Sequence, residues 1–105
     1  MAYKTAFVAM APEADPKKHR VSMKLPKYEF TAVLVGLGNV AQAIEVCQDL
    51  VKNEGVHGII LCPGFPHEAV AKICSAVGPA VAVNVARGDV PAGMITGQIL
   101  AKEWH

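Results

Sequence analysis

Four short apolar runs divide the chain into regular segments. They cover residues 5–11, 30–36, 56–62 and 80–86, and a Pro or Gly residue lies within two positions after each of them. Continuous apolar runs of this length are typical of strands that are buried on both faces of a sheet. The pattern therefore predicts a sheet of four strands.

Two stretches between these runs repeat apolar residues at helical spacing. The first begins at Asn39, whose side chain can accept from a free backbone amide, with Gln42 three residues later as in a capping box. Gly55 then supplies a left-handed stop. The expected buried stripe of this helix consists of Val40, Ala43, Ile44, Cys47, Leu50 and Val51.

The second helical stretch has Pro66 at its first turn and ends at Gly78, which Pro79 follows. Its apolar stripe holds Val70, Ile73, Cys74 and Val77. Cys74, like Cys47 on the first helix, is interpreted as a core packing residue, since it falls on the apolar stripe.

The order of elements predicts a single α/β domain over residues 1–105. It is strand, strand, helix, strand, helix, strand, and it favours a small, open, mainly parallel four-stranded sheet with two crossover helices. Three prolines exclude a continuous helix from residues 12–29, which we expect to be a long loop with at most one turn near residues 17–23. The tail, residues 87–105, is expected to be irregular or helical, with a helix from about residue 95 that Gly97 weakens.

The composition indicates more apolar surface than one small core needs. Hydrophobic residues make up 52% of the 105 residues and charged residues 18%. If both helices lie on one face of the sheet, the other face needs a cover, from residues 12–29, the tail or a partner subunit. We therefore expect a homo-oligomer.

Charge and cysteine content exclude several classes of protein. The net charge of +1 gives no electrostatic footprint for nucleic acid. The three cysteines fit no metal or redox spacing, so we expect reduced thiols in a cytoplasmic protein without metal or cofactor. The N-terminal apolar run is at the lower limit for a secretory signal and no run approaches membrane-spanning length, so we interpret the first run as a strand and expect no membrane association.

A candidate site follows from the parallel sheet. Ligands bind beyond the carboxyl ends of the strands in such sheets, where four loops converge: residues 11–20, 36–39, 62–67 and 86–89. Glycines allow close approach of backbone there, and two helix starts offer amides to an anion. The candidate ligand-binding residues are Glu13, His19, Arg20, Gly36, Gly38, Asn39, Gly64, Phe65, His67 and Arg87.

Two motifs at this edge suggest chemistry. Cys62 could be a nucleophile or His67 a general base, although Cys62 is more simply a packing residue. The spacing Gly36-x-Gly38-x-x-Ala41 matches a dinucleotide fingerprint. The next run lacks the acidic residue that would hold a ribose, so we interpret this motif as a turn leading to the Asn39 cap.

The segments "APEADPKKHR", "AIEVCQDLV" and "GIILCPGFPHEAVAKICSAVG" together resemble a small uncharacterised bacterial family, a domain of unknown function. The resemblance extends over roughly residues 4–89. It implies a stand-alone α/β domain and no catalytic assignment. The positions it favours for testing are Glu13, His19, Arg20, Cys62, Gly64, Phe65 and His67.

The sequence leaves three functional hypotheses. The first is a self-associating domain that binds a small anionic or polar ligand at the strand ends. The second is an enzyme that uses His67 or Cys62. The third is a structural subunit without a ligand.

Overall fold

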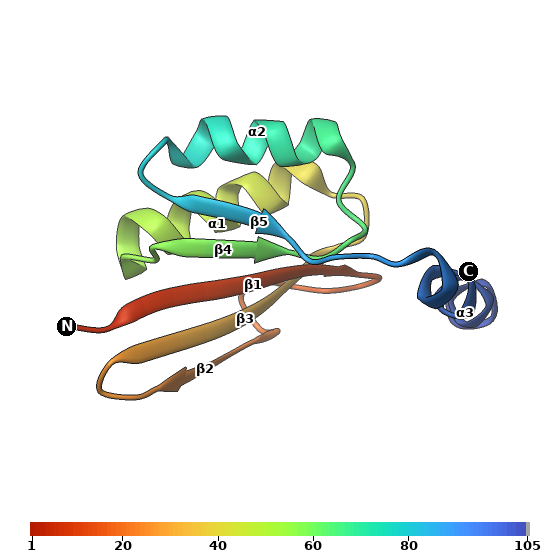
Figure 1. Cartoon of the computed structure of the whole chain (residues 1–105), viewed down its shortest axis with the longest axis horizontal. Coiled ribbons are helices and arrows are strands. Elements are labelled where there is room, and N and C mark those ends of the chain that lie inside the picture. Colours follow the sequence, from red (N-terminus) through yellow and green to blue (C-terminus); the bar gives the residue numbers. More distant parts are fainter. Residues whose placement is uncertain (105) are drawn as a thin grey trace.

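The computed structural model describes residues 1–104 as one five-stranded sheet with three helices (Figure 1). The strands lie in the order β2-β3-β1-β4-β5. β1 pairs in parallel with both β3 and β4, β4 pairs in parallel with β5, and β2 is antiparallel to β3. The elements along the chain are β1 (Tyr3–Ala11), β2 (Arg20–Lys24), β3 (Tyr28–Gly36), α1 (Val40–Glu54), β4 (Gly58–Leu61), α2 (His67–Val77), β5 (Ala82–Val85) and α3 (Val90–Glu103).

The α/β class and the four parallel strands are confirmed, but the prediction of four strands is wrong because it missed β2. All five residues of β2 are exposed, and the strand pairs with β3 alone at the sheet edge. An edge strand of this kind needs no continuous apolar run, so its signal is weak. The segment expected to be a long loop therefore contains a strand over Arg20–Lys24.

The predicted caps of α1 are largely confirmed. The Asn39 side chain accepts from the amide of Gln42 at 3.0 Å, and Gly55 ends the helix with φ 71°. The Gln42 side chain does not complete a capping box, because it accepts instead from the amide of Gly36 at 2.6 Å. The predicted stripe faces the sheet, with Val46 also buried.

α2 packs beside α1, but Cys74 does not face the core as predicted. Ala69 and Ile73 are the buried residues of α2, whereas Cys74 is exposed. Ile73 and Cys74 are neighbours in the helix, and their side chains point about 100° apart. Cys74 therefore lies at the border of the apolar stripe, outside the surface that packs against the core. The interpretation of Cys74 as a core residue is therefore wrong, while that of Cys47 is confirmed.

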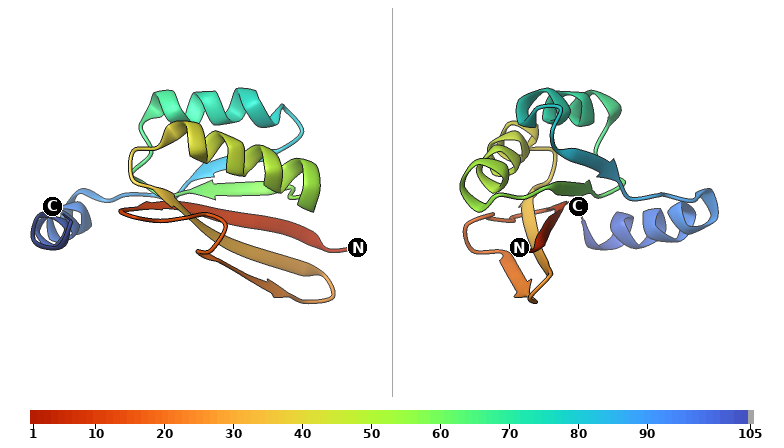
Figure 2. Two further views of the ribbon diagram at one scale, coloured as in Figure 1. Left: turned by 180° about the vertical axis from the view of Figure 1, so that it is seen from behind. Right: turned by 60° about the vertical axis from the view of Figure 1, so that its left-hand side comes forward.

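Both α1 and α2 cover the same face of the sheet (Figures 1 and 2). Side chains that alternate along β1 and β3 supply the core on this side, and Leu50, Ile59 and Ile73 are fully buried in it. The core residues contributed by the two strands are Ala6, Val8, Met10, Val33 and Val35.

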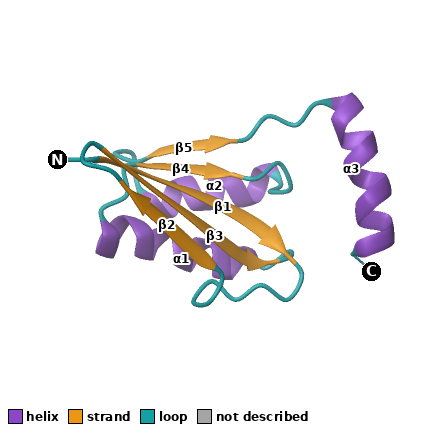
Figure 3. Ribbon diagram, turned by 90° about the horizontal axis from the view of Figure 1, so that it is seen from below, coloured by secondary structure: helices purple, strands orange, loops and turns teal. Residues whose placement is uncertain are grey.

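Within residues 1–104, no helix lies on the opposite face of the sheet, which we call the open face (Figure 3). One cross-strand row on it runs Val21, Ala32, Phe7 and Ile60, from β2 through β3 and β1 to β4. Val21 and Met23 are 64% and 59% exposed. Residues 12–29, one of the segments expected to cover this face, contain β2. Because β2 pairs with β3 within the sheet, it extends the open face instead of covering it.

α3 is longer than expected and stands apart from the sheet. It begins at Val90, with Pro91 in its first turn, and therefore starts about five residues before the predicted residue 95. No residue of α3 is buried. Among the described residues, no helix combines the length and apolar character needed to cross a membrane.

Replacing Gly55 with alanine tests the left-handed end of α1. A Cβ atom is strained at φ 71°, so Gly55→Ala lowers the free energy of unfolding by about 1 kcal/mol. Urea unfolding followed by circular dichroism measures the change. Gly64→Ala is the control, because its Cβ would lie in ordinary contact, 3.7 Å from Cys62 Sγ, and it should change stability much less.

The buried thiol of Cys47 predicts a loss of stability in alkali. Burial raises the pKa of Cys47 from 9.0 to about 12, so the unfolded chain ionises first and folding stability falls between those values. In urea unfolding, the stability advantage of the wild type over Cys47→Ala should shrink by about 1.4 kcal/mol between pH 8 and pH 10. An advantage that stays constant over this range would contradict the prediction.

Candidate functional site

The carboxyl ends of the four parallel strands lie at one edge of the sheet, but they do not end at the same level. Ala11 of β1 is paired with Gly36 of β3, whereas Leu61 of β4 is paired with Val8 of β1. β1 therefore extends three residues beyond the end of β4. The last residues of β1 have a strand neighbour only on the β3 side.

A groove occupies this step in the sheet edge. Its volume is about 930 Å³. Its lining residues come from the sheet edge and the loop after β4 on one side and from α3 on the other. Figure 3 shows α3 opposite the carboxyl ends of the strands. The lining residues are Ala9, Met10, Leu37, Cys62, Pro63, Gly64, Arg87, Gly88, Asp89, Val90, Ala92, Gly93, Thr96, Gly97, Leu100 and Trp104.

The connection from β5 to α3 sets the distance between these two sides of the groove. The amide of Ala86 donates to Leu61 at 2.8 Å and so continues the pairing of β5 with β4. A Cβ on Gly88 would lie 3.3 Å from the ring of Pro63, so glycine permits close approach to the loop after β4. The chain then leaves the sheet and enters α3 at Val90.

Most of the groove lining is apolar, and its charged groups come from one short segment. Arg87 Nε donates to Asp89 Oδ1 at 2.6 Å, and the two side chains are 87% and 53% exposed. An exposed pair of this kind contributes little to folding stability. It does place a guanidinium group with further N–H donors at the mouth of an apolar groove.

The loop after β4 contributes part of the predicted site. Cys62 is half-buried and lines the groove together with Gly64. Phe65 is only 3% exposed and packs in the core, so its ring anchors the loop and does not line the groove. His67 is exposed in the first turn of α2, and no hydrogen bond between Cys62 and His67 is present in residues 1–104.

The turn after β3 is structural at most of its positions. Gly38 has φ 73°, and Asn39 and the Gly36 amide are engaged in the start of α1 as described above. None of these three lines the groove. The residue between the two glycines, Leu37, does.

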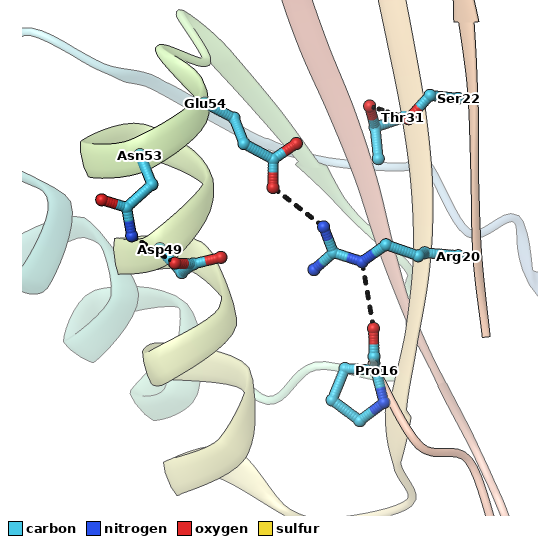
Figure 4. A network of polar contacts seen from close by, with 7 residues as sticks. All are labelled: Pro16, Arg20, Ser22, Thr31, Asp49, Asn53 and Glu54. Atoms are coloured by element: carbon cyan, nitrogen blue, oxygen red, sulfur yellow. Dashed lines mark hydrogen bonds and ion pairs between the residues drawn. The ribbon is translucent and has the colours of Figure 1, made fainter. Parts of the chain in front are cut away.

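The basic segment after β1, residues 15–20, does not line the groove. His19 Nδ1 accepts from the amide of Asp15 at 2.8 Å, which closes a local turn. Arg20 Nη1 contacts Glu54 Oε2 at 2.8 Å, and its Nε donates to the carbonyl of Pro16 at 3.1 Å (Figure 4). Arg20 thus joins β2 to the end of α1 on the helix-covered face and does not reach the groove.

Glu13 lies beside the groove, not in it. It has φ 63° and lines a smaller adjoining cavity of about 530 Å³. That cavity shares Leu37 and Trp104 with the groove. Of the residues expected at the site, the structure therefore brings together Cys62, Gly64 and Arg87, with Glu13 at the margin.

The side of α3 that lines the groove is not among the residues predicted from the sequence. Gly93, Thr96, Gly97, Leu100 and Trp104 follow the spacing of one helix face. This stripe could have been found from the sequence, but its small and polar members make it inconspicuous beside the stripes of α1 and α2. No cluster of three or more potential metal-ligating residues occurs in the described part of the chain.

Comparison with known proteins gives one match. A family model described as a family of unknown function (DUF6506) matches residues 3–99. No curated protein and no solved structure matches the chain. The expected resemblance to an uncharacterised family is thus confirmed, and no activity comes with it.

Cys62 and Trp104 both line the groove, so a quencher attached to Cys62 should lower the fluorescence of Trp104. A nitroxide label on Cys62, in a chain with Cys74 replaced by serine, should quench the fluorescence of Trp104, the only tryptophan. The matched control carries the label on exposed Cys74 of α2, with Cys62 replaced by serine, and should leave the emission nearly unchanged. Equal emission from the two labelled proteins would show that α3 does not face the loop after β4.

Proposed function

The chain belongs to this family of unknown function, and we propose from the geometry of the groove that it binds a small molecule with an apolar body and an anionic or strongly polar head. The body occupies the space between the sheet edge and α3. The head lies at the mouth, against Arg87. The ligand expected from the sequence was small and anionic or polar, and the groove adds an apolar body to that description.

The position of the groove is the observation that carries this proposal. From β1 the chain passes to β3 on one side, and from β3 it crosses back to β4 on the other. β1 and β4 therefore flank the point where the strand order reverses, and ligands of open α/β sheets bind outside the carboxyl ends of the strands at that point. The groove is lined by residues of both, including Ala9 and Cys62.

The composition of the lining supports the chemical class of the ligand. A pocket that is mainly apolar with a few polar groups at one end favours a molecule of the same asymmetry. Leu37, Leu100 and Trp104 are suited to an apolar body. Arg87 uses its Nε–H on Asp89, which leaves its other N–H groups for a carboxylate or a similar oxygen acceptor.

Asp89 sets a limit on the charge of the head group. Its carboxylate accepts from Arg87 and lines the same groove, so the pair is neutral in sum. A single negative charge can share the guanidinium, whereas a multiply charged phosphate meets repulsion from Asp89. We therefore expect a carboxylate or sulfonate to bind more tightly than a phosphate.

The cysteines support a location within the cytoplasm. Cys47, Cys62 and Cys74 are free thiols, and Cys74 is exposed. Exposed free thiols persist in a reducing compartment. We place the protein there on this ground.

Binding of anilinonaphthalene sulfonate and of decanoate tests the proposal, since both join an apolar body to one negative charge. Titration is followed by Trp104 emission and by calorimetry. Arg87→Gln should weaken binding about tenfold, which corresponds to about 1.4 kcal/mol. Lys72→Gln, the same charge change on the exposed face of α2, is the control and should leave the Kd unchanged.

Filling the groove provides a second arm of this experiment. Gly97 lines the groove, and a Cβ there meets no atom within 4 Å, so we expect the side chain of Gly97→Leu to extend into the open space of the groove. It should abolish binding of both probes, and Gly97→Ala should weaken binding less. Binding that survives Gly97→Leu unchanged would place the probes elsewhere, for example on the open face, and would refute the proposed site.

A further inference from the structure

The open face of the sheet is apolar over most of its area. The strand side chains that alternate onto it include no charged residue. Phe7, Phe30 and Ile60 occupy its centre and are only partly buried, while Val21, Met23 and Leu34 are exposed. An exposed apolar surface of this extent on a small domain is typical of an interaction site.

α3 carries a second apolar surface, which no other segment of residues 1–104 buries. Its groove-facing residues account for one side of the helix. The other side, which we call the outer stripe, is formed by Pro91, Met94, Ile95, Gln98, Ile99 and Lys102. Met94, Ile95 and Ile99 are 66%, 62% and 55% exposed.

An isolated helix of this length is marginal in water without a packed face. α3 has no buried residue in the single chain, and two of its residues are glycines, which lower its helical propensity further. Packing of the outer stripe against another apolar surface would therefore stabilise this helix.

We propose that a second copy of this chain covers the open face with the outer stripe of its α3, and that each copy does so for the other. The contact is then isologous, with the same two surfaces used by both copies. This arrangement covers both unpartnered surfaces of the chain at once. It also identifies the cover of the open face, because the chain's own α1 and α2 lie on the opposite face and β2 lies within the sheet.

The dimensions of the two surfaces agree. The 14 residues of α3 make a helix roughly 21 Å long. Five strands at the usual spacing span roughly 19 Å, so one helix can cross the whole sheet. The polar groups also correspond, since Gln98 of the outer stripe can meet Asn84, which shares a register row with Ile60 on the open face.

The chain's own α3 is poorly placed to cover its own sheet. It lies beyond the carboxyl ends of the strands and runs across them (Figure 3). Its groove-facing side is turned to its own sheet edge, so the outer stripe is turned away. The groove-facing side of α3 stays free in this dimer, so dimerisation and ligand binding use different surfaces of the same helix.

Mass measurement on the full chain provides the first test. Size-exclusion chromatography with light scattering and sedimentation velocity should give twice the chain mass at micromolar concentration. Val21→Lys on the open face and Ile99→Lys on the outer stripe should each raise the dimer Kd at least tenfold. Both positions are exposed in the single chain, so the variants should keep the circular dichroism spectrum of a folded protein.

The control for these variants is Ala71→Lys, at an exposed position of α2 away from both surfaces. It should leave the dimer unchanged. A monomer at all concentrations overturns the proposal. So does a dimer that neither Val21→Lys nor Ile99→Lys weakens, since that dimer would use another surface, such as the β2 edge.

Crosslinking identifies which α3 covers which face. In a background with Cys62 and Cys74 replaced by serine, one chain carries Asn84→Cys and another carries Gln98→Cys, two exposed positions that the proposed contact brings together. A short bismaleimide should join the mixed chains into a dimer and should join neither chain to itself. If a single chain with both substitutions gives only an internal crosslink, α3 covers its own sheet and the proposal fails.

Discussion

The packing of α1 and α2 against one face of the sheet is the interaction on which the rest of the structure depends. Leu50 and Ile73 of the helices are fully buried against Val8, Val33 and other strand residues. This contact uses every buried helical residue, because α3 contributes none. Because the core lies on one face of the sheet only, the other, apolar face stays exposed. α3 does not pack into this core.

The same arrangement creates the groove. β4 and β5 have four residues each, whereas β1 and β3 have nine, so the sheet edge is stepped beside β1. The connection through Gly88 carries α3 past this step without filling it. The site thus depends on a difference in strand length and on a close approach between Gly88 and Pro63, and not on a cluster of reactive groups.

The candidate site was only partly predictable. The rule that loops converge at the carboxyl ends of parallel strands correctly placed Cys62, Gly64 and Arg87 at one edge. The same rule failed for Arg20, because its place in β2 directs it to Glu54 at the end of α1, on the helix-covered face of the sheet. Sequence proximity to a strand end does not give the direction of a side chain, which depends on the pairing and register of its own strand.

The sequence by itself determined the parallel strands, the extent of α1 and α2, the caps of α1 and the buried thiol of Cys47. These features follow from local periodicity and from residues such as Asn39 and Gly55 that act on neighbouring backbone. Only the tertiary structure decided the pairing of β2, the exposure of Cys74, the position of α3 and the groove. Each of these depends on contacts between segments distant in the chain, which local patterns do not encode.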